Sequence, residues 1–167
     1  KTVLIVEDEK LIRQGIRTMV QRSGVPIEVI MECNNGEAAL EILKDQKVDV
    51  MFTDIRMPKM DGLELVREVQ KLSHKPQIVA VSGYDDFAYA VELLRHGVRE
   101  YILKPVEREK ITAILKTLEE EYEQKRKQAQ ADHQIANNQL RYPLMNENPH
   151  DKEVQLLEQK YEEQFFP

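Results

Sequence analysis

The sequence predicts an α/β protein built as (βα)₅, a doubly wound parallel sheet with helices on both faces. Over the first 120 residues, short apolar runs alternate with amphipathic segments, the order that parallel strands joined by helical crossovers require. The apolar runs are hydrophobic at most positions, as strands covered on both faces are. A length of 167 residues suits one such domain and an appendage.

The first four elements follow from apolar content and spacing. Thr2–Val6 reads as a buried strand, and the helix after it has its apolar side chains at Leu11, Ile12, Ile16, Met19 and Val20. Val25–Glu32 is a second strand, rich in β-branched residues. Asn34 or Asn35 can cap the next helix. Its apolar stripe is Ala38, Ala39, Ile42 and Leu43.

The remaining strands are expected at Val48–Thr53, Ile78–Val81 and Tyr101–Leu103. Asp61 can cap the third helix, whose apolar face is Leu63, Leu65, Val66 and Val69. Gly97 suits the C-terminal cap of the fourth helix, whose face is Phe87, Ala90, Val91 and Leu94. A fifth helix starts at Glu107, with an apolar face of Ile111, Ile114, Leu115 and Leu118.

The pattern changes after this apolar face. Glu119–Gln130 is rich in Glu, Gln, Lys and Arg, so we expect the fifth helix to continue outward, solvated on most sides. Prolines and asparagines in residues 137–149 predict a loop. Pro149 can then open a further helix, with a stripe of Val154, Leu157, Tyr161 and Phe165. We therefore divide the chain into a domain of residues 1–121 and a helical extension of residues 122–167.

Composition narrows the class of protein. The net charge of −6 argues against a basic nucleic-acid-binding surface on these residues. A single cysteine, Cys33, excludes an intramolecular disulfide and fits a buried thiol in a reducing cytoplasm. No apolar run approaches the roughly 20 residues that span a bilayer, and no signal peptide precedes the first strand. We expect a cytoplasmic protein without a membrane partner.

Five polar side chains lie where predicted strands end, and they indicate a site. They are Glu7, Asp8, Asp54, Ser82 and Lys104. Because parallel strands end at one edge of a sheet, these residues are expected to converge. Three carboxylates repel one another by roughly 1 to 4 kcal/mol per close pair, which a cation relieves. Oxygen ligands in a partly hydrated site favour Mg²⁺ or Mn²⁺.

Each of these residues also has a simpler reading. Asp8 and Asp54 can merely cap the helices that follow them. Lys104 can be a solvated lysine, although an ammonium there would suit a phosphoryl oxygen. Ser82 can be an ordinary residue at the end of a strand. Tyr101 lies three residues before Lys104, so it points to the opposite face of its strand and can be a half-buried aromatic.

Four segments carry a family resemblance: Val3–Glu9, Asp54–Gly62, Ser82–Tyr84 and Tyr101–Pro105. In this order and spacing, they resemble the receiver domain of two-component response regulators over residues 2 to about 121. The resemblance implies a flavodoxin-like fold with strand order 2-1-3-4-5. The stretch Ser82–Ala90 further resembles receivers attached to AraC-type helix-turn-helix output domains.

The resemblance implies a role for each site residue. Asp54 is the expected phosphoacceptor, taking a phosphoryl group from the phosphohistidine of a sensor histidine kinase. Glu7 and Asp8 are expected to hold Mg²⁺, together with Asp54 and the main-chain carbonyl of Arg56. Ser82 and Lys104 are expected to bind the phosphoryl oxygens. Ser82 and Tyr101 are the expected switch pair, which changes the surface formed by the fourth helix, the fifth strand and the fifth helix.

Departures from the family and rival functions stay open at this point. Glu7 replaces an aspartate and Ser82 replaces a threonine that are commoner in the family, and both keep the needed chemistry. A rival is a haloacid dehalogenase-type phosphatase with Asp54 as its nucleophile. That class uses a second aspartate, two residues after the nucleophile, as its acid–base group, and this chain has Arg56 at that position. A receiver-like module that docks partners without phosphorylation would need a broken site, and this one is complete.

Partners follow from the same resemblance. The residues contain no complete helix-turn-helix and no basic recognition helix, so DNA contact is expected only through an output domain beyond Pro167. The fifth helix and the residues after it leave homodimerisation open. The chain is expected to be a phosphoacceptor switch that assists its own phosphorylation and dephosphorylation, and not an enzyme that turns over a substrate.

Overall fold

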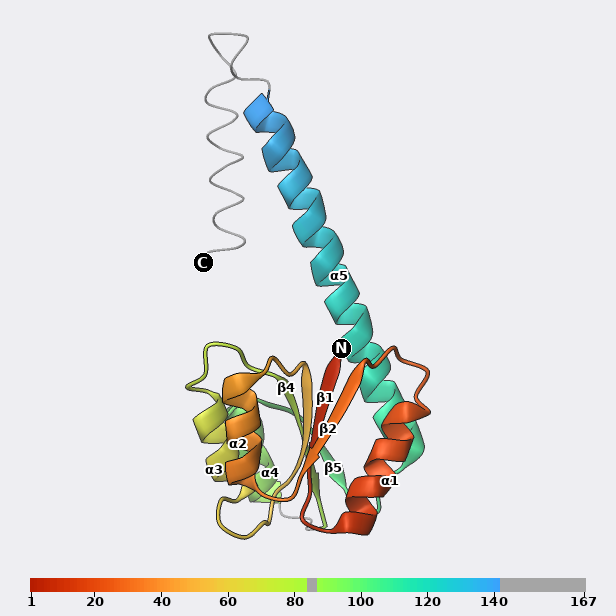
Figure 1. Ribbon diagram of the computed structural model, residues 1–167, viewed down its shortest axis with the longest axis vertical. Coiled ribbons are helices and arrows are strands. Elements are labelled where there is room, and N and C mark those ends of the chain that lie inside the picture. Colours follow the sequence, from red (N-terminus) through yellow and green to blue (C-terminus); the bar gives the residue numbers. More distant parts are fainter. Residues whose placement is uncertain (84–86, 142–167) are drawn as a thin grey trace. The chain divides into compact units, whose positions relative to one another are not determined.

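Five parallel strands form one sheet in the order β2-β1-β3-β4-β5 (Figure 1), in a computed structural model that describes residues 1–83 and 87–141. The strands are β1 (Thr2–Val6), β2 (Val29–Cys33), β3 (Val50–Asp54), β4 (Gln77–Ser82) and β5 (Val98–Leu103). All four neighbouring pairs run parallel. The predicted fold class and strand order are therefore confirmed.

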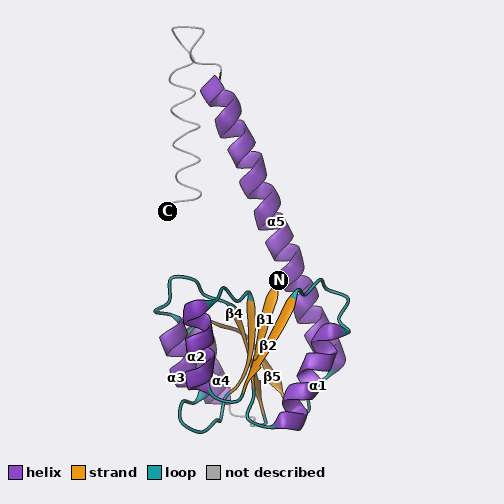
Figure 2. Ribbon diagram, viewed as in Figure 1, coloured by secondary structure: helices purple, strands orange, loops and turns teal. Residues whose placement is uncertain are grey.

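Helices cover both faces of the sheet. They are α1 (Lys10–Gln21), α2 (Gly36–Asp45), α3 (Gly62–Val69), α4 (Phe87–Arg95) and α5 (Arg108–Arg141). Figure 2 shows α1 and the first part of α5 on one face and α2, α3 and α4 on the other. From β1 the chain winds outward to β2 and then returns to β3 on the other side. This reversal opens a crevice at the carboxyl ends of β1 and β3.

The central strands form the core. Every residue of β3 is buried, and the largest fully buried side chains include Phe52, Met51, Leu4 and Ile5. Burying one such aliphatic or aromatic side chain stabilises the fold by about 1.5–3 kcal/mol relative to exposure. Since these side chains flank the ends of β1 and β3, the backbone that leads into the crevice is rigidly held.

The predicted helix caps are found in the structure. The Asn35 side chain accepts a hydrogen bond from the Ala38 N–H at 2.8 Å, so of the two asparagines Asn35 is the cap. The Asp61 side chain accepts from the Glu64 N–H at 2.9 Å at the start of α3. Gly97 follows α4 with a φ of 100°, a conformation that glycine adopts without steric cost.

Several local predictions were wrong. Leu11, predicted on the apolar face of α1, is 82% exposed, and β5 begins at Val98 and not at Tyr101. β2 begins at Val29 and not at Val25, because Pro26 has no N–H for a strand ladder and the Lys1 carbonyl accepts from the Glu28 N–H just before the strand. On α4 the buried leucine is Leu93, whereas Leu94 is 47% exposed. Cys33 is only partly buried, although burial still raises the pKa of its thiol to about 11.

The fifth helix continues beyond its apolar face as expected. It reaches Arg141, so the loop predicted for residues 137–149 was wrong for its first five residues. The helix predicted to begin at Pro149 lies outside the described residues. Internal contacts divide the chain into two units, Lys1–Thr117 and Leu118–Pro167. Among the described residues, no helix is both long enough and apolar enough to cross a bilayer.

Candidate functional site

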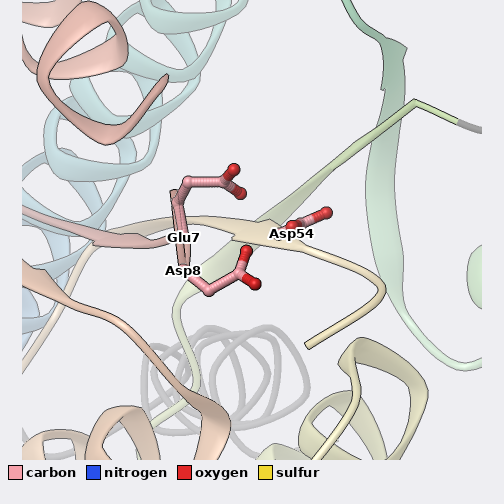
Figure 3. Close-up of side chains that lie close together, drawn as sticks. All are labelled: Glu7, Asp8 and Asp54. Carbon is pink, nitrogen blue, oxygen red and sulfur yellow. The ribbon is translucent and has the colours of Figure 1, made fainter. Parts of the chain in front are cut away.

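The fold brings the predicted acidic residues together at the carboxyl edge of the sheet. Glu7 and Asp8 directly follow β1, and Asp54 is the last residue of β3. Each contributes a carboxylate oxygen, and these three oxygens lie within 4.8 Å of one another. Figure 3 shows the three carboxylates gathered beside the ends of the two strands. The convergence expected from strand ends is thus present.

Lys104 joins this cluster from β5. Its Nζ lies 3.0 Å from Glu7 Oε1 and 3.5 Å from Asp54 Oδ2, so one ammonium bridges two carboxylates. The Lys104 N–H donates to the Ser82 carbonyl at 2.7 Å, which fixes the end of β5 beside the end of β4. The peptide bond between Lys104 and Pro105 is cis. All five strand-end residues therefore meet in one region.

Burial within the site is unequal. Glu7 and Ser82 are each 1% exposed and Asp54 is 6% exposed, whereas Asp8 is exposed to solvent. The buried side chains close the site toward the core, and the exposed Asp8 leaves it open to solvent, where a diffusing cation can enter. Tyr101 lies half-buried on β5 and packs against the core cluster that contains Leu93 of α4. It thus lines the α4 side of the sheet, as its spacing from Lys104 predicted.

The electrostatics of the site favour a bound cation. Burial raises the pKa of the Glu7 carboxyl from 4.5 to about 7; the Asp54 carboxylate adds to the rise and Lys104 opposes it. Burial alone would lower the pKa of Lys104, but its hydrogen bond to Glu7 and the charge of Asp54 raise it. One ammonium thus leaves the three carboxylates with an excess of negative charge.

One buried atom tests the fit of a metal ion. Glu7 Oε2 is buried and has no hydrogen-bond partner among the described residues. A buried carboxylate oxygen without a partner is costly unless a cation satisfies it. With the Asp8 and Asp54 oxygens close by, the donor set consists of hard oxygen ligands, as Mg²⁺ prefers. The residues therefore fit a divalent cation of this type.

The helix-capping alternative is not supported. The N-cap of α1 is Glu9, and no side chain caps that helix. The cap of α3 is Asp61, seven positions after Asp54. Asp54 instead accepts a hydrogen bond from the Ile55 N–H at 2.8 Å through Oδ1. Asp8 and Asp54 thus do not serve as helix caps in this fold.

The loop after β3 is closely packed. A Cβ added at Gly62 would lie 2.7 Å from the Ile55 Cα and 2.9 Å from the Asp54 carbonyl oxygen, so only glycine fits there. The Gly62 N–H donates to the Ile55 carbonyl at 2.6 Å. Lys59 holds a φ of 71°, which is rare for a residue with a side chain. This packing fixes the loop that carries Arg56, whose carbonyl stays a predicted ligand.

Sequence reasoning missed one residue at this site. Arg13, in the first turn of α1, donates from Nη1 to the Glu7 carbonyl at 2.8 Å. A cation five residues after an acidic pair, in the helix that follows it, was the available signal. That signal is weak, because most arginines in a first helical turn are solvated.

Comparisons with known proteins agree with this geometry. The family model described as "Response regulator receiver domain" matches residues 3–116. A Bacillus subtilis transcriptional regulatory protein, YesN, is 31% identical over 137 residues, covering 80% of this chain and 37% of that protein. The Salmonella typhi transcriptional regulatory protein BtsR is 35% identical over 119 residues, covering 71% and 48%. The chain thus spans less than half the length of these two relatives.

Solved structures give the same picture. The REC domain of AraT, a response regulator from Geobacillus stearothermophilus, is 36% identical with a TM-score of 0.66, and the match covers 75% of this chain and 97% of that one. The response regulatory domain of mrkE from Klebsiella pneumoniae is 32% identical with a TM-score of 0.67, covering 74% and 99%. With its acidic cluster, bridging lysine and sheet order, the chain belongs to the response regulator receiver domain family.

Proposed function

We propose that Asp54 accepts a phosphoryl group from the phosphohistidine of a sensor histidine kinase and that the modified domain switches a transcription-regulating output domain. The single observation that carries this proposal is the acidic cluster of Glu7, Asp8 and Asp54, with Lys104 bridging two of its members. It places a nucleophile, hard oxygen ligands and an ammonium in one crevice. These are the parts that phosphoryl transfer by positioning and charge neutralisation requires.

The acidic residues hold the metal in this proposal. Glu7, Asp8, Asp54 and the Arg56 carbonyl are the ligands, directly or through water, for Mg²⁺ or Mn²⁺. When bound, the ion neutralises charge on the phosphoryl oxygens and helps to align the donor with the acceptor. Glu7 Oε2 is buried without a hydrogen-bond partner among the described side chains, so this oxygen gains most from contact with a cation.

The transfer itself uses the Asp54 carboxylate. One of its oxygens attacks phosphorus as the bond to the donor imidazole breaks, and the electron pair of that bond stays on the imidazole nitrogen, which then takes up a proton. Lys104 moves from Glu7 and Asp54 to a phosphoryl oxygen, and the Ser82 hydroxyl donates to another. Both contacts compensate the dianion that the reaction places in the crevice.

The switch connects this crevice to the surface. Ser82 is the end of β4, and Tyr101 lies on the adjacent β5, packed toward α4. We infer that the Ser82 hydroxyl moves toward the phosphoryl group and that the Tyr101 ring turns inward. The surface of α4, β5 and α5 then changes its preference for partners.

The output side of the proposal draws on the relatives. Several carry names of transcriptional regulators, and one similar solved structure, 32% identical, is described as a two-component transcriptional regulator AraC from Clostridium phytofermentans. We propose residues 1–121 as the receiver and residues 122–167 as the link to an AraC-type output domain. In this proposal the output domain contacts DNA, and the protein is cytoplasmic. The phosphorylated receiver can also form a homodimer through its changed surface.

An enzyme of the haloacid dehalogenase type is disfavoured by one residue. That chemistry uses an acid–base aspartate two residues after the nucleophile, and here that position is Arg56. Steady turnover of a phosphomonoester by the purified chain would revive this alternative. We propose instead a module that assists its own phosphorylation and dephosphorylation.

Intact-mass spectrometry tests the proposal. The purified chain is incubated with acetyl phosphate and Mg²⁺, beside an Asp54→Asn variant treated identically. We expect one phosphoryl group on the wild-type chain and none on the variant. An unmodified wild-type chain, or a variant modified to the same extent, would overturn the assignment of Asp54.

A further inference from the structure

Arg13 reaches from α1 to the backbone of the acidic pair. Its Nη1 donates to the Glu7 carbonyl at 2.8 Å, and its Nε lies 3.4 Å from Glu32 Oε1 in β2. The Arg13 side chain is 18% exposed, so this contact is partly sheltered from water. One guanidinium thus joins the end of β1, the first turn of α1 and β2.

The carbonyl that Arg13 binds is the one that joins Glu7 to Asp8. On its other side, the Glu7 N–H donates to the Cys33 carbonyl at 3.1 Å. Glu7 is therefore held at both of its backbone polar groups, once by β2 and once by Arg13. Fixing the plane of the Glu7–Asp8 peptide fixes the nitrogen and the Cα of Asp8, the point from which its exposed side chain leaves the backbone.

We infer that Arg13 is a positioning residue for the metal-binding carboxylates, acting through the Glu7–Asp8 peptide. This inference rests on the proposed function of the cluster as a Mg²⁺ site. Groups that orient the ligands of a metal ion commonly change its affinity by about 10- to 100-fold when they are removed. Here Arg13 orients the Glu7–Asp8 peptide. The carboxylate positioned by that peptide is Asp8, which is less buried than Glu7 and Asp54.

The geometry explains why an arginine is needed. A guanidinium presents donors in a rigid fork, so it can bind a carbonyl and a carboxylate at the same time. A lysine carries the same charge on a single ammonium and would have to choose between the Glu7 carbonyl and Glu32. Glu32, which also pairs with Arg17, offsets part of the Arg13 charge and so reduces its repulsion of a bound cation.

Arg17 provides a matched control. Its Nη1 lies 2.9 Å from Glu32 Oε2 and 3.3 Å from the Ile30 carbonyl, both in β2. Arg17 therefore shares Glu32 with Arg13, but within the described part of the chain it makes no hydrogen bond or ion pair with Glu7. An Arg17→Lys variant perturbs the same ion network and the same helix without touching the Glu7–Asp8 peptide.

Isothermal titration calorimetry with Mg²⁺ alone tests the inference on the full chain and its Arg13→Lys and Arg17→Lys variants. We expect Arg13→Lys to weaken Mg²⁺ binding by about tenfold and Arg17→Lys to leave the dissociation constant within about twofold. Thermal unfolding without Mg²⁺ accompanies each titration. If Arg13 only stabilised the fold, both variants would have equally lowered unfolding midpoints, and their dissociation constants for Mg²⁺ would be equal.

Each outcome has a distinct meaning. Equal affinity of Arg13→Lys and wild type, or an equal loss in both variants, overturns the role of Arg13 while the metal site stands. No Mg²⁺ binding by the wild-type chain overturns the metal site and the inference together. If Arg13→Lys fails to fold, Arg13→Gln is titrated at roughly 0.5 M salt, where long-range charge effects are screened. The same tenfold loss is then expected, and wild-type affinity refutes the inference.

Discussion

The raised pKa of Glu7 makes the stability of the metal-free protein depend on pH. Glu7 is 1% exposed, and burial raises the pKa of its carboxyl from 4.5 to about 7 in the fold. A carboxyl with a raised pKa in the folded state binds a proton more tightly there than in the unfolded chain. Its protonated form therefore stabilises the fold at low pH, and that stability is lost as the pH rises through the folded pKa.

The size of the effect follows from the two pKa values. Taking 4.5 for the unfolded chain and about 7 for the fold, the Glu7 contribution falls by roughly 2 to 3 kcal/mol between about pH 5 and about pH 8. Mg²⁺ should reverse the trend, because it binds the ionised carboxylates and competes with the proton. The stabilisation by Mg²⁺ should therefore be small at the lower pH and large at the higher one.

Urea unfolding across this pH range measures the effect. The free energy of unfolding is compared for wild type and Glu7→Gln, first with a chelator and then with millimolar Mg²⁺. The difference between the two proteins isolates Glu7 from other groups that titrate in the same range. In the chelator series we expect the variant to gain stability relative to wild type as the pH rises. A difference that is flat, or that changes in the opposite direction, would refute the reasoning.

Substitutions at three further positions have signs set by the structure. Asp54→Asn should raise metal-free stability at alkaline pH by about 1 kcal/mol, since the repulsion from the Glu7 and Asp8 carboxylates that it removes outweighs the 3.5 Å contact with Lys104 that it weakens, and Oδ1 can still accept from the Ile55 N–H; a loss in urea unfolding would contradict this. Lys59→Asn should stabilise by about 0.5–1 kcal/mol, because asparagine tolerates the φ of 71° better, and an unchanged thermal midpoint would refute it. Asp61→Ala should cost about 1 kcal/mol through loss of the α3 cap, whereas Asp61→Asn should recover most of that loss in the same assay.

The fold was predictable because its signals are local. Apolar runs, helical spacing and cap residues act over a few positions; the order of the elements and the caps Asn35 and Asp61 proved correct. The start of β2 was less predictable, because Pro26 and the Lys1 carbonyl end the ladder through a contact distant in sequence. The choice between Leu93 and Leu94 depends on how α4 rotates against the sheet, which helical spacing alone leaves open by about one residue.

The candidate site was predictable for a topological reason. Parallel strands deliver their ends to one edge, so Glu7, Asp54 and Lys104 had to meet once the strands were placed. Their pairings were not predictable. Lys104 contacts two carboxylates, and its contact with Glu7 at 3.0 Å is shorter than its contact with Asp54 at 3.5 Å. Arg13 escaped notice because its partner is a backbone carbonyl, and residue type alone does not reveal such a contact.

Mapping the phosphorylated residue tests the central claim most directly. The wild-type chain is treated with acetyl phosphate, with Mg²⁺ or with a chelator, and the acyl phosphate is trapped with borohydride, which converts phosphoaspartate to homoserine. Peptide mass spectrometry then locates the homoserine. The convergent site predicts homoserine at position 54 alone, formed with Mg²⁺ and nearly absent with the chelator. Trapping at another residue, or equal trapping without a divalent cation, would contradict it.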